Sequence, residues 1–288
     1  MFSWASLCGD RPAVMGIVNV TPDSFSDGGR YLDADAAVAH GLALVAAGAD
    51  VLDVGGESTR PGAEPVTEAE EMRRVLPVVS RLAESAGVPV SIDTSKAAVA
   101  AAALDAGAEI VNDVTAARFD PDVLDVVAGR RAGYVAMHMQ GEPRTMQREP
   151  RYVDVVAEVA DFLVDRLEVA RGAGVDDGAL CADPGIGFGK LAWHNLALLA
   201  RLDELVARLG VPVLVGTSRK TFLGAIVADA TGATEPLPPE ARDDATLATA
   251  VWAIDRGAAI VRVHDVRPVA ESVRLMTVMR ELDAEAVA

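Results

Sequence analysis

A glycine-rich stretch at residues 183–190 carries the clearest chemical pattern of this chain. It begins with Asp183 directly after the apolar run 179–182, where a buried strand would run out into a loop. Three glycines at alternate positions let the backbone approach a flat or anionic ligand, with φ above zero at some of them. Asp183, Phe188 and Lys190 add a carboxylate, an aromatic ring and a cation. The pattern favours a ligand site, although taken alone it also fits a turn whose aspartate caps a helix.

Polar residues follow seven other apolar runs in the same way. They are Asn19, Asp53 with Glu57, Asp93, Asn112, His138, Ser218 with Lys220, and Arg262 with His264. Any single one would more often be a core polar group with a hydrogen-bond partner, or a helix cap. Each is costly to bury without a partner, so their repetition at equivalent positions favours one shared site.

The elements that would position these residues are eight short apolar runs, each followed by a helical pattern. The expected strands are residues 14–20, 51–55, 88–93, 109–114, 133–139, 179–183, 211–217 and 259–264. The expected helices are residues 33–48, 67–87, 95–107, 121–132, 152–174, 193–210, 219–257 and 267–286, with a Gly/Pro segment at 231–239 splitting the seventh. Without a linker, this alternation predicts one α/β domain over residues 1–288, a single (β/α)8 TIM barrel with its active site at the C-terminal ends of the strands. A doubly wound open sheet is the alternative.

Composition limits the partners. The chain is 51% hydrophobic, enough for a large core, and its net charge of −17 argues against nucleic acid and anionic membranes as partners. No apolar run approaches the roughly 20 residues that a membrane helix needs, and no signal peptide is visible. With only two cysteines and no disulfide framework, we expect a cytoplasmic protein.

The strand-end residues suit a particular kind of ligand. Asp93, Asn112 and Asp183 match the donor and acceptor edge of a fused heterocycle, and Lys220 could donate to a carbonyl oxygen of the same ring. Arg262 can stack on a flat ring or bind phosphate. The chain has three lysines, Lys96, Lys190 and Lys220, all just past strand-like runs, which hints at an electropositive pocket. For His138, a structural imidazole and a ligand contact remain equally open.

Two further segments, residues 21–29 and 57–63, are rich in Gly, Pro and hydroxyl groups. They suit active-site lids that carry a few charged residues inward. Ordinary solvated loops would have the same composition.

Taken together, these motifs resemble the dihydropteroate synthase family of folate biosynthesis, over residues 14–282. The resemblance rests on residues 19–29, 53–62, 91–94, 112–114, 137–141, 183–190, 218–220 and 262–266. It implies a transferase that joins 6-hydroxymethyl-7,8-dihydropterin diphosphate to p-aminobenzoate and releases pyrophosphate. It also implies Mg²⁺ near Asn19 and a homodimer, for which Leu275, Met276 and Met279 of the last helix are suited.

The resemblance further implies roles for individual residues. The catalytic residues would be Asp23, Arg60, Asp93 and Lys220. The pterin diphosphate would be bound by Thr59, Asp93, Asn112, Asp183, Phe188, Gly216, Lys220, Arg262 and His264. The p-aminobenzoate would be bound by Phe25, Thr59, Pro61, Ser218 and Lys220.

Two alternatives share the barrel. A corrinoid-dependent methyltetrahydrofolate methyltransferase also holds a pterin with aspartates and an asparagine, but it lacks both loop signatures and the run Ser218, Arg219, Lys220. A catalytically inactive pterin-binding module would more often have lost the residue 59–62 motif or Lys220. Both features are present in this chain, which favours the synthase.

Overall fold

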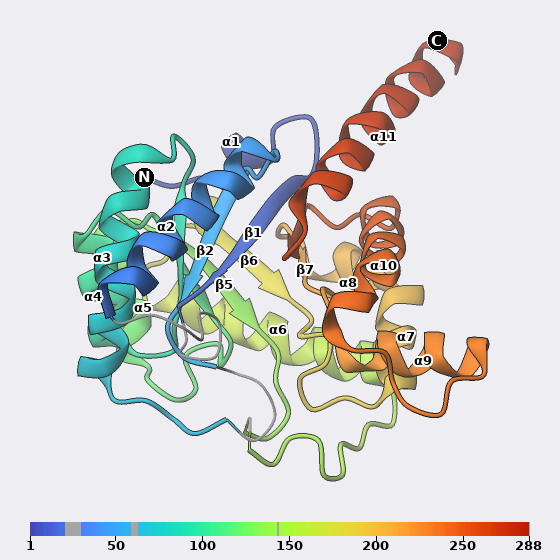
Figure 1. Cartoon of the computed structure of the whole chain (residues 1–288), viewed down its shortest axis with the longest axis horizontal. Coiled ribbons are helices and arrows are strands. Elements are labelled where there is room, and N and C mark those ends of the chain that lie inside the picture. The colour runs from blue at the N-terminus through green and yellow to red at the C-terminus, as the bar shows by residue number, and fades with distance from the viewer. Residues whose placement is uncertain (21–29, 59–62, 143, 288) are drawn as a thin grey trace.

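A computed structural model shows the predicted barrel, with strands in the centre and helices around them (Figure 1). The structure describes residues 1–20, 30–58, 63–142 and 144–287. The strands are β1 (Ala13–Asn19), β2 (Val51–Gly55), β3 (Val90–Asp93), β4 (Ile110–Asp113), β5 (Gly133–Met137), β6 (Leu180–Asp183), β7 (Leu214–Val215) and β8 (Ile260–Val263). They form an eight-stranded parallel sheet in the order β6-β5-β4-β3-β2-β1-β8-β7. A single parallel bridge between Ala182 and Val213 joins its two edges, so the sheet closes and the open-sheet alternative is excluded.

The helices follow the predicted alternation, apart from one break and an additional N-terminal helix. They are α1 (Trp4–Cys8), α2 (Arg30–Ala46), α3 (Glu68–Ser85), α4 (Ala97–Asp105), α5 (Asp122–Arg130), α6 (Val155–Gly172), α7 (Ala192–Ala200), α8 (Leu202–Leu209), α9 (Thr221–Thr231), α10 (Asp243–Asp255) and α11 (Val266–Val287), with short 3-10 turns η2 (Asp177–Ala179) and η3 (Pro239–Arg242). The expected helix 193–210 is broken into α7 and α8 at Arg201, which has non-helical dihedrals. The split expected near residues 231–239 is confirmed by α9, η3 and α10.

The seventh strand is shorter than the sequence predicts, at two residues. It is flanked by Pro212 and Gly216, and these residue types are disfavoured inside a strand because one lacks an N–H and the other lacks a side chain to pack. Pro212 still accepts a hydrogen bond through its carbonyl from the Ala182 N–H at 3.0 Å. This weak edge is where the barrel closes.

An unpredicted N-terminal helix, α1, closes the barrel at the end where the strands begin. Trp4 of α1 is fully buried, and its Nε1 donates to the Ala179 carbonyl at 2.8 Å. It packs with an apolar layer formed by inward-facing residues of seven strands: Ala13, Met15, Val51, Ile110, Val135, Cys181, Leu214 and Ile260. This apolar layer, called the floor below, lies beneath the carboxyl ends of the strands.

Strand periodicity places the polar residues directly above that floor. Side chains of a strand alternate between its two faces, so a residue two positions after an inward apolar residue also faces inward. Asp53 follows Val51 in this way, and Arg262 follows Ile260. The same step leads from Ile110 to Asn112 and from Cys181 to Asp183. The barrel interior therefore changes from apolar to charged within one layer.

Among the described residues, no helix is long and apolar enough to cross a membrane. Figure 1 shows α11 extending away from the barrel towards the C-terminus. Two of its apolar side chains, Leu275 and Met279, are 63% and 59% exposed, whereas Met276 packs against the core.

Candidate active site

A hydrogen-bonded network of charged and amide groups joins four strands at their carboxyl ends. Arg262 of β8 donates from Nε to Asp53 Oδ2 at 2.6 Å and from Nη2 to Asp93 Oδ2 at 2.9 Å. Asn112 of β4 donates from Nδ2 to the same oxygen of Asp53 at 3.0 Å. Three residues predicted to bind one ligand thus belong to one network: Asp53 joins Asn112 to Arg262, and Arg262 joins them to Asp93.

Asp53 is the residue whose role the sequence analysis missed. It appeared there only as one strand-end residue among several, whereas the structure buries it completely as the acceptor of two donors. Its Oδ1 and the hydroxyl of Ser91, its register neighbour on β3, have no hydrogen-bond partner in the described part of the chain. The period-two pattern from Val51 is the signal that would have singled it out.

The ionisation of Asp93 is balanced between opposing effects. Its side chain is 14% exposed. Burial raises the pKa of Asp93 to about 7. The neighbouring Arg262 opposes this shift, whereas Asp53 and other carboxylates add to it. The charge on Asp93 therefore depends on both its burial and its neighbours Arg262 and Asp53.

A second group lies around Lys220, the residue that precedes α9. Its Nζ is 4.1 Å from the ring centroid of Phe188, a cation–π contact. Burial lowers the pKa of Lys220 to about 8, with Asp183 and Asp93 raising it and Arg262 lowering it. These electrostatic interactions connect Lys220 to the network of Arg262, so both groups belong to one site.

Asp183 and Gly216 complete this part of the site. Asp183 is 6% exposed, and its Oδ1 accepts the Gly185 N–H at 2.7 Å, while burial raises its pKa. Gly216 lies beside Arg262, because a Cβ built on it would be 3.8 Å from Arg262 Cβ. Asp183 also interacts electrostatically with Arg262, so both residues belong to the surroundings of the Arg262 side chain.

Ser218 and His264 were predicted at opposite ends of the ligand set, and they contact each other. The Ser218 hydroxyl lies 2.8 Å from His264 Nδ1 and accepts the His264 backbone N–H at 3.1 Å. Asn19 is half-buried at the end of β1. Among the described residues, no group of three or more His, Cys, Asp or Glu side chains is arranged to hold a metal ion.

The suggestion that three lysines form one electropositive pocket is wrong. Lys96 pairs with Glu57 and with the fully buried Glu71. Lys190 points back into its own loop, where its Nζ contacts backbone carbonyls and His138. Lys220 alone of the three contacts the candidate site, because the other two have nearby polar partners that satisfy their charge or hydrogen bonds.

Five predicted residues cannot be placed. Asp23 and Phe25, and the consecutive residues Thr59, Arg60 and Pro61, lie outside the described residues. Their roles stay predictions.

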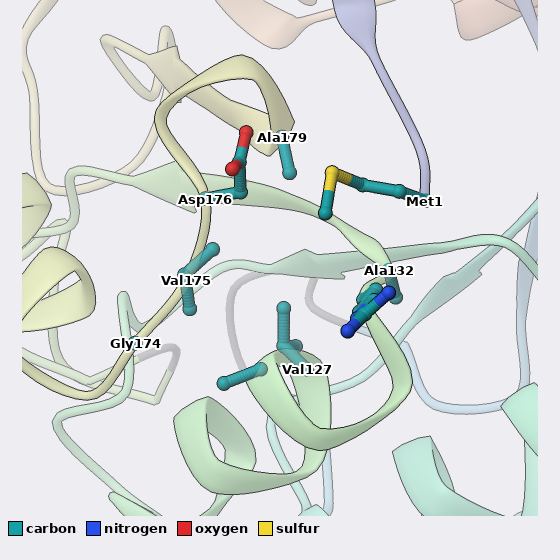
Figure 2. A pocket seen from close by; sticks show the side chains of 9 residues that line it. Met1, Val127, Ala132, Gly174, Val175, Asp176 and Ala179 are labelled. Atoms are coloured by element: carbon teal, nitrogen blue, oxygen red, sulfur yellow. The ribbon is translucent and has the colours of Figure 1, made fainter.

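A small cavity at the other end of the barrel is separate from this site. It has a volume of about 140 Å³ and is lined by Met1, Val127, Val175, Asp176 and Ala179, among others (Figure 2). Ala179 immediately precedes β6, so the cavity lies near the amino end of that strand, whereas the charged network lies at the carboxyl ends.

Comparison with known proteins decides the family. The sequence profile described as pterin binding enzyme matches residues 15–264. The chain is 51% identical over 268 residues to the dihydropteroate synthase of Mycobacterium leprae, covering 91% of this chain and 92% of that protein. The chain belongs to the dihydropteroate synthase family. Another member, from Bacillus subtilis, is 44% identical and is matched over 94% of this chain and 89% of its own length.

Solved structures of this family share the barrel. The Xanthomonas albilineans dihydropteroate synthase with 4-aminobenzoic acid is 49% identical, with a TM-score of 0.86 and coverage of 94% of both chains. The Yersinia pestis dihydropteroate synthase in complex with a sulfonamide drug is 43% identical, with a TM-score of 0.86 and coverage of 94% of this chain and 95% of that one. A second X. albilineans structure, in complex with 7,8-dihydropteroate, is 46% identical, with a TM-score of 0.82 and coverage of 94% of both chains.

Proposed function

We propose that the charged network at the carboxyl ends of the strands binds a pterin diphosphate and promotes its condensation with p-aminobenzoate. The function is that of a dihydropteroate synthase, a transferase of folate biosynthesis that forms 7,8-dihydropteroate and releases pyrophosphate. Apart from the family, the observation that carries the proposal is the pairing of Arg262 with Asp53 and Asp93 above a closed apolar floor. Acceptors and a planar cation in one layer match a flat, polar heterocycle.

The pterin would be held by its hydrogen-bonding edge. Asp93 and Asp183 would accept its N–H groups, Asn112 would pair with a neighbouring edge position, and Lys220 would donate to the ring carbonyl. Phe188, already in contact with Lys220, would flank the ring. In this arrangement Asp93, Asp183 and Lys220 would contact the ligand in a barrel interior where electrostatic interactions are stronger than in water.

The bond changes need no protein nucleophile. The C–O bond between the pterin methylene and the diphosphate breaks, and its electron pair leaves with pyrophosphate. The amine of p-aminobenzoate then donates its lone pair to the methylene carbon, and the new C–N bond is completed by loss of a proton from that nitrogen. The protein would act by stabilising negative charge at the leaving group through His264 and the Arg262 cation, and positive charge at the ring through Asp93 and Asp183.

Mg²⁺ is part of this proposal. Asn19 would supply a neutral oxygen ligand, which fits an ion that takes most of its shell from water and substrate phosphates. When bound, the ion would neutralise charge on the diphosphate.

The second substrate is proposed from the relatives. Structures similar to this chain contain 4-aminobenzoic acid or a sulfonamide drug. We place the p-aminobenzoate carboxylate at Ser218, whose hydroxyl already contacts His264. Asp23, Phe25, Thr59, Arg60 and Pro61 would complete the site from the two loops.

The remaining assignments concern the protein as a whole. We propose one domain over residues 1–288, a cytoplasmic location and a homodimer. The exposed Leu275 and Met279 of α11 are available for a second copy, whereas Met276 packs against the core.

The deciding experiment is an assay of the purified protein with the pterin diphosphate, p-aminobenzoate and Mg²⁺. Dihydropteroate and pyrophosphate should appear in equal amounts. Binding of the pterin without product would indicate a pterin-binding module, and methyl transfer from methyltetrahydrofolate would indicate the corrinoid-dependent alternative.

A further inference from the structure

Lys190 is a buried cation-bearing side chain that the proposed reaction does not use. It is 3% exposed, and it forms no ion pair with the described residues. Its Nζ instead lies 3.0 Å from the Gly185 carbonyl, 3.1 Å from the Phe188 carbonyl and 2.8 Å from His138 Nδ1. A buried amino group is costly, and burial lowers the pKa of Lys190 well below its usual value. The hydrogen bonds of this buried amino group therefore need a structural or functional account.

What Lys190 holds is the glycine loop, defined here as residues 183–190. The lysine comes from the last position of the loop and binds carbonyls near its beginning and its end, so it closes the loop on itself. Two more loop carbonyls are bound from outside, Gly187 by Gln147 Nε2 and Gly189 by the Tyr152 hydroxyl at 2.9 Å. The backbone of the loop is thereby fixed by side chains at four carbonyls.

His138 links this loop to β5. The Gly185 backbone has φ of +65°, and a Cβ there would lie 1.8 Å from the His138 carbonyl, so the loop and the end of β5 are in direct contact. The His138 ring packs edge-on against Phe162 with centroids 4.8 Å apart. Burial and the neighbouring Lys190 lower the pKa of His138 to about 2, so its ring is neutral. His138 is therefore a fixed partner for Lys190 and not a charged ligand contact.

Lys220 lies against the other side of the loop, at Gly187 and Phe188, and these two residues are called the wall below. The Lys220 ammonium is 4.1 Å from the Phe188 ring centroid, and a Cβ at Gly187 would come within 3.0 Å of Lys220 Cδ. The charged groups that act on Lys220 are Asp183 from β6, Arg262 from β8 and Asp93 from β3. Since burial is the main cause that lowers the pKa of Lys220 to about 8, this pKa reports whether the wall is in place.

We propose that Lys190 and His138 are positioning residues for Lys220. Their hydrogen bonds hold the glycine loop in the shape that covers the Lys220 side chain and directs its ammonium at the ligand. The direction towards a pterin rests on the proposed function, whereas the effect on Lys220 itself requires no substrate.

The chain offers an unusually direct measurement, because it contains only three lysines. The full chain labelled with ¹³C at lysine Cε should give three resonances, and Lys190→Met should remove one and leave Lys96 and Lys220 to titrate. With the wall displaced, we expect the pKa of Lys220 to rise by about one unit or more, because desolvation is what lowers it. Binding of 7,8-dihydropteroate should weaken and kcat/KM should fall roughly tenfold or more, as expected for a misplaced contact.

Tyr134→Phe is the matched control. Its hydroxyl makes a buried 3.0 Å hydrogen bond to Asp113 Oδ2, and its loss lowers stability without touching the glycine loop. In this variant the Lys220 titration should stay at the wild-type pH. His138→Leu is a second test that removes only one partner of Lys190, and it should shift Lys220 in the same direction. His138→Gln, which keeps an acceptor, should shift it less.

The outcomes are separable. A folded Lys190→Met or His138→Leu protein in which Lys220 titrates at the wild-type pH and dihydropteroate binds as before would overturn the proposal. If Lys190→Met does not fold, the His138 variants decide alone. Wild-type protein that forms no dihydropteroate would overturn the proposed function, while the Lys220 titrations would still test the positioning role.

Discussion

Asp53→Asn is the substitution that tests the charged network most directly. Asp53 is fully buried, and its Oδ2 accepts from both Arg262 Nε and Asn112 Nδ2. The asparagine keeps one acceptor oxygen but removes the negative charge and introduces an NH₂ group beside other donors. Removing one partner of a buried ion pair costs about 3–5 kcal/mol. We expect about 3 kcal/mol here, the lower end of that range, because Arg262 keeps Asp93 as a partner.

The same substitution should move the pKa of Asp93 downwards. The Asp53 charge is one of the causes that raise the pKa of Asp93, and Arg262 would be left with Asp93 as its nearer counter-ion. A lower pKa means that the Asp93 carboxylate persists to lower pH, so pterin binding should survive further into acid than in the wild type. The variant should thus be less stable and yet bind the pterin at lower pH than the wild type does. A general loss of folding would weaken binding at every pH and would not produce this combination.

Two assays measure these effects. Denaturant unfolding gives the change in the free energy of unfolding. Measuring 7,8-dihydropteroate binding between pH 5 and 8 locates the acid limb, the pH range in which binding is lost as the pH falls. At roughly 2–3 °C per kcal/mol for a chain of this size, the melting temperature should fall by about 6–9 °C. Ser91→Ala is the control, because it removes an adjacent buried hydroxyl without a partner in the described part of the chain and should leave both quantities near wild type. Unchanged stability and an unchanged acid limb in Asp53→Asn would refute the role given to this network.

Three further predictions concern the ligand-facing residues. Asp93→Asn should weaken pterin binding roughly 5- to 150-fold, about 1–3 kcal/mol, because its NH₂ group would face donors of the ring, and calorimetry that finds wild-type affinity would make Asp93 structural. Lys220→Arg should lower kcat/KM at least about tenfold with little change in melting temperature, because the guanidinium fork is wider than the ammonium that lies against Phe188, and kinetics within twofold of wild type would contradict that contact role. The pH profile of kcat/KM should be bell-shaped, rising as Asp93 ionises through about 7 and falling as Lys220 loses its proton above about 8, and a flat profile between pH 6 and 9 would count against these two groups.

The convergence of Asp93, Asn112, Asp183 and Arg262 could be predicted from the sequence because it follows from strand periodicity. Each stands at the end of an apolar run, and parallel strands of one barrel bring their carboxyl ends together. The eight strands were predicted for the same reason, since buried parallel strands are short and apolar. Most of them are one or two residues shorter than predicted, and the seventh, which lies between Pro212 and Gly216, is shortened most.

Contacts between distant segments could not be predicted in this way. The bond between Lys190 and His138 spans 52 positions, and nothing in the pattern of the glycine loop says whether its lysine faces a ligand or its own backbone. The pairing of Lys96 with Glu57 and Glu71 is of the same kind. The helix that carries Trp4 has five residues, too few for a readable period.

The geometry of Arg262 also favours one of the two roles that the sequence left open for it. Two of its three guanidinium nitrogens already donate, Nε to Asp53 and Nη2 to Asp93. To bind a phosphate in bidentate fashion through these nitrogens, Arg262 would have to break its hydrogen bonds to the two carboxylates. Stacking on a ring uses the face of the guanidinium and leaves both bonds intact. The two carboxylates raise the pKa of Arg262 against the effect of its burial, so the cation is retained while its orientation is fixed. We therefore assign Arg262 chiefly to stacking on the pterin ring, from where its charge still acts on the leaving group, and we assign direct contact with the diphosphate to His264.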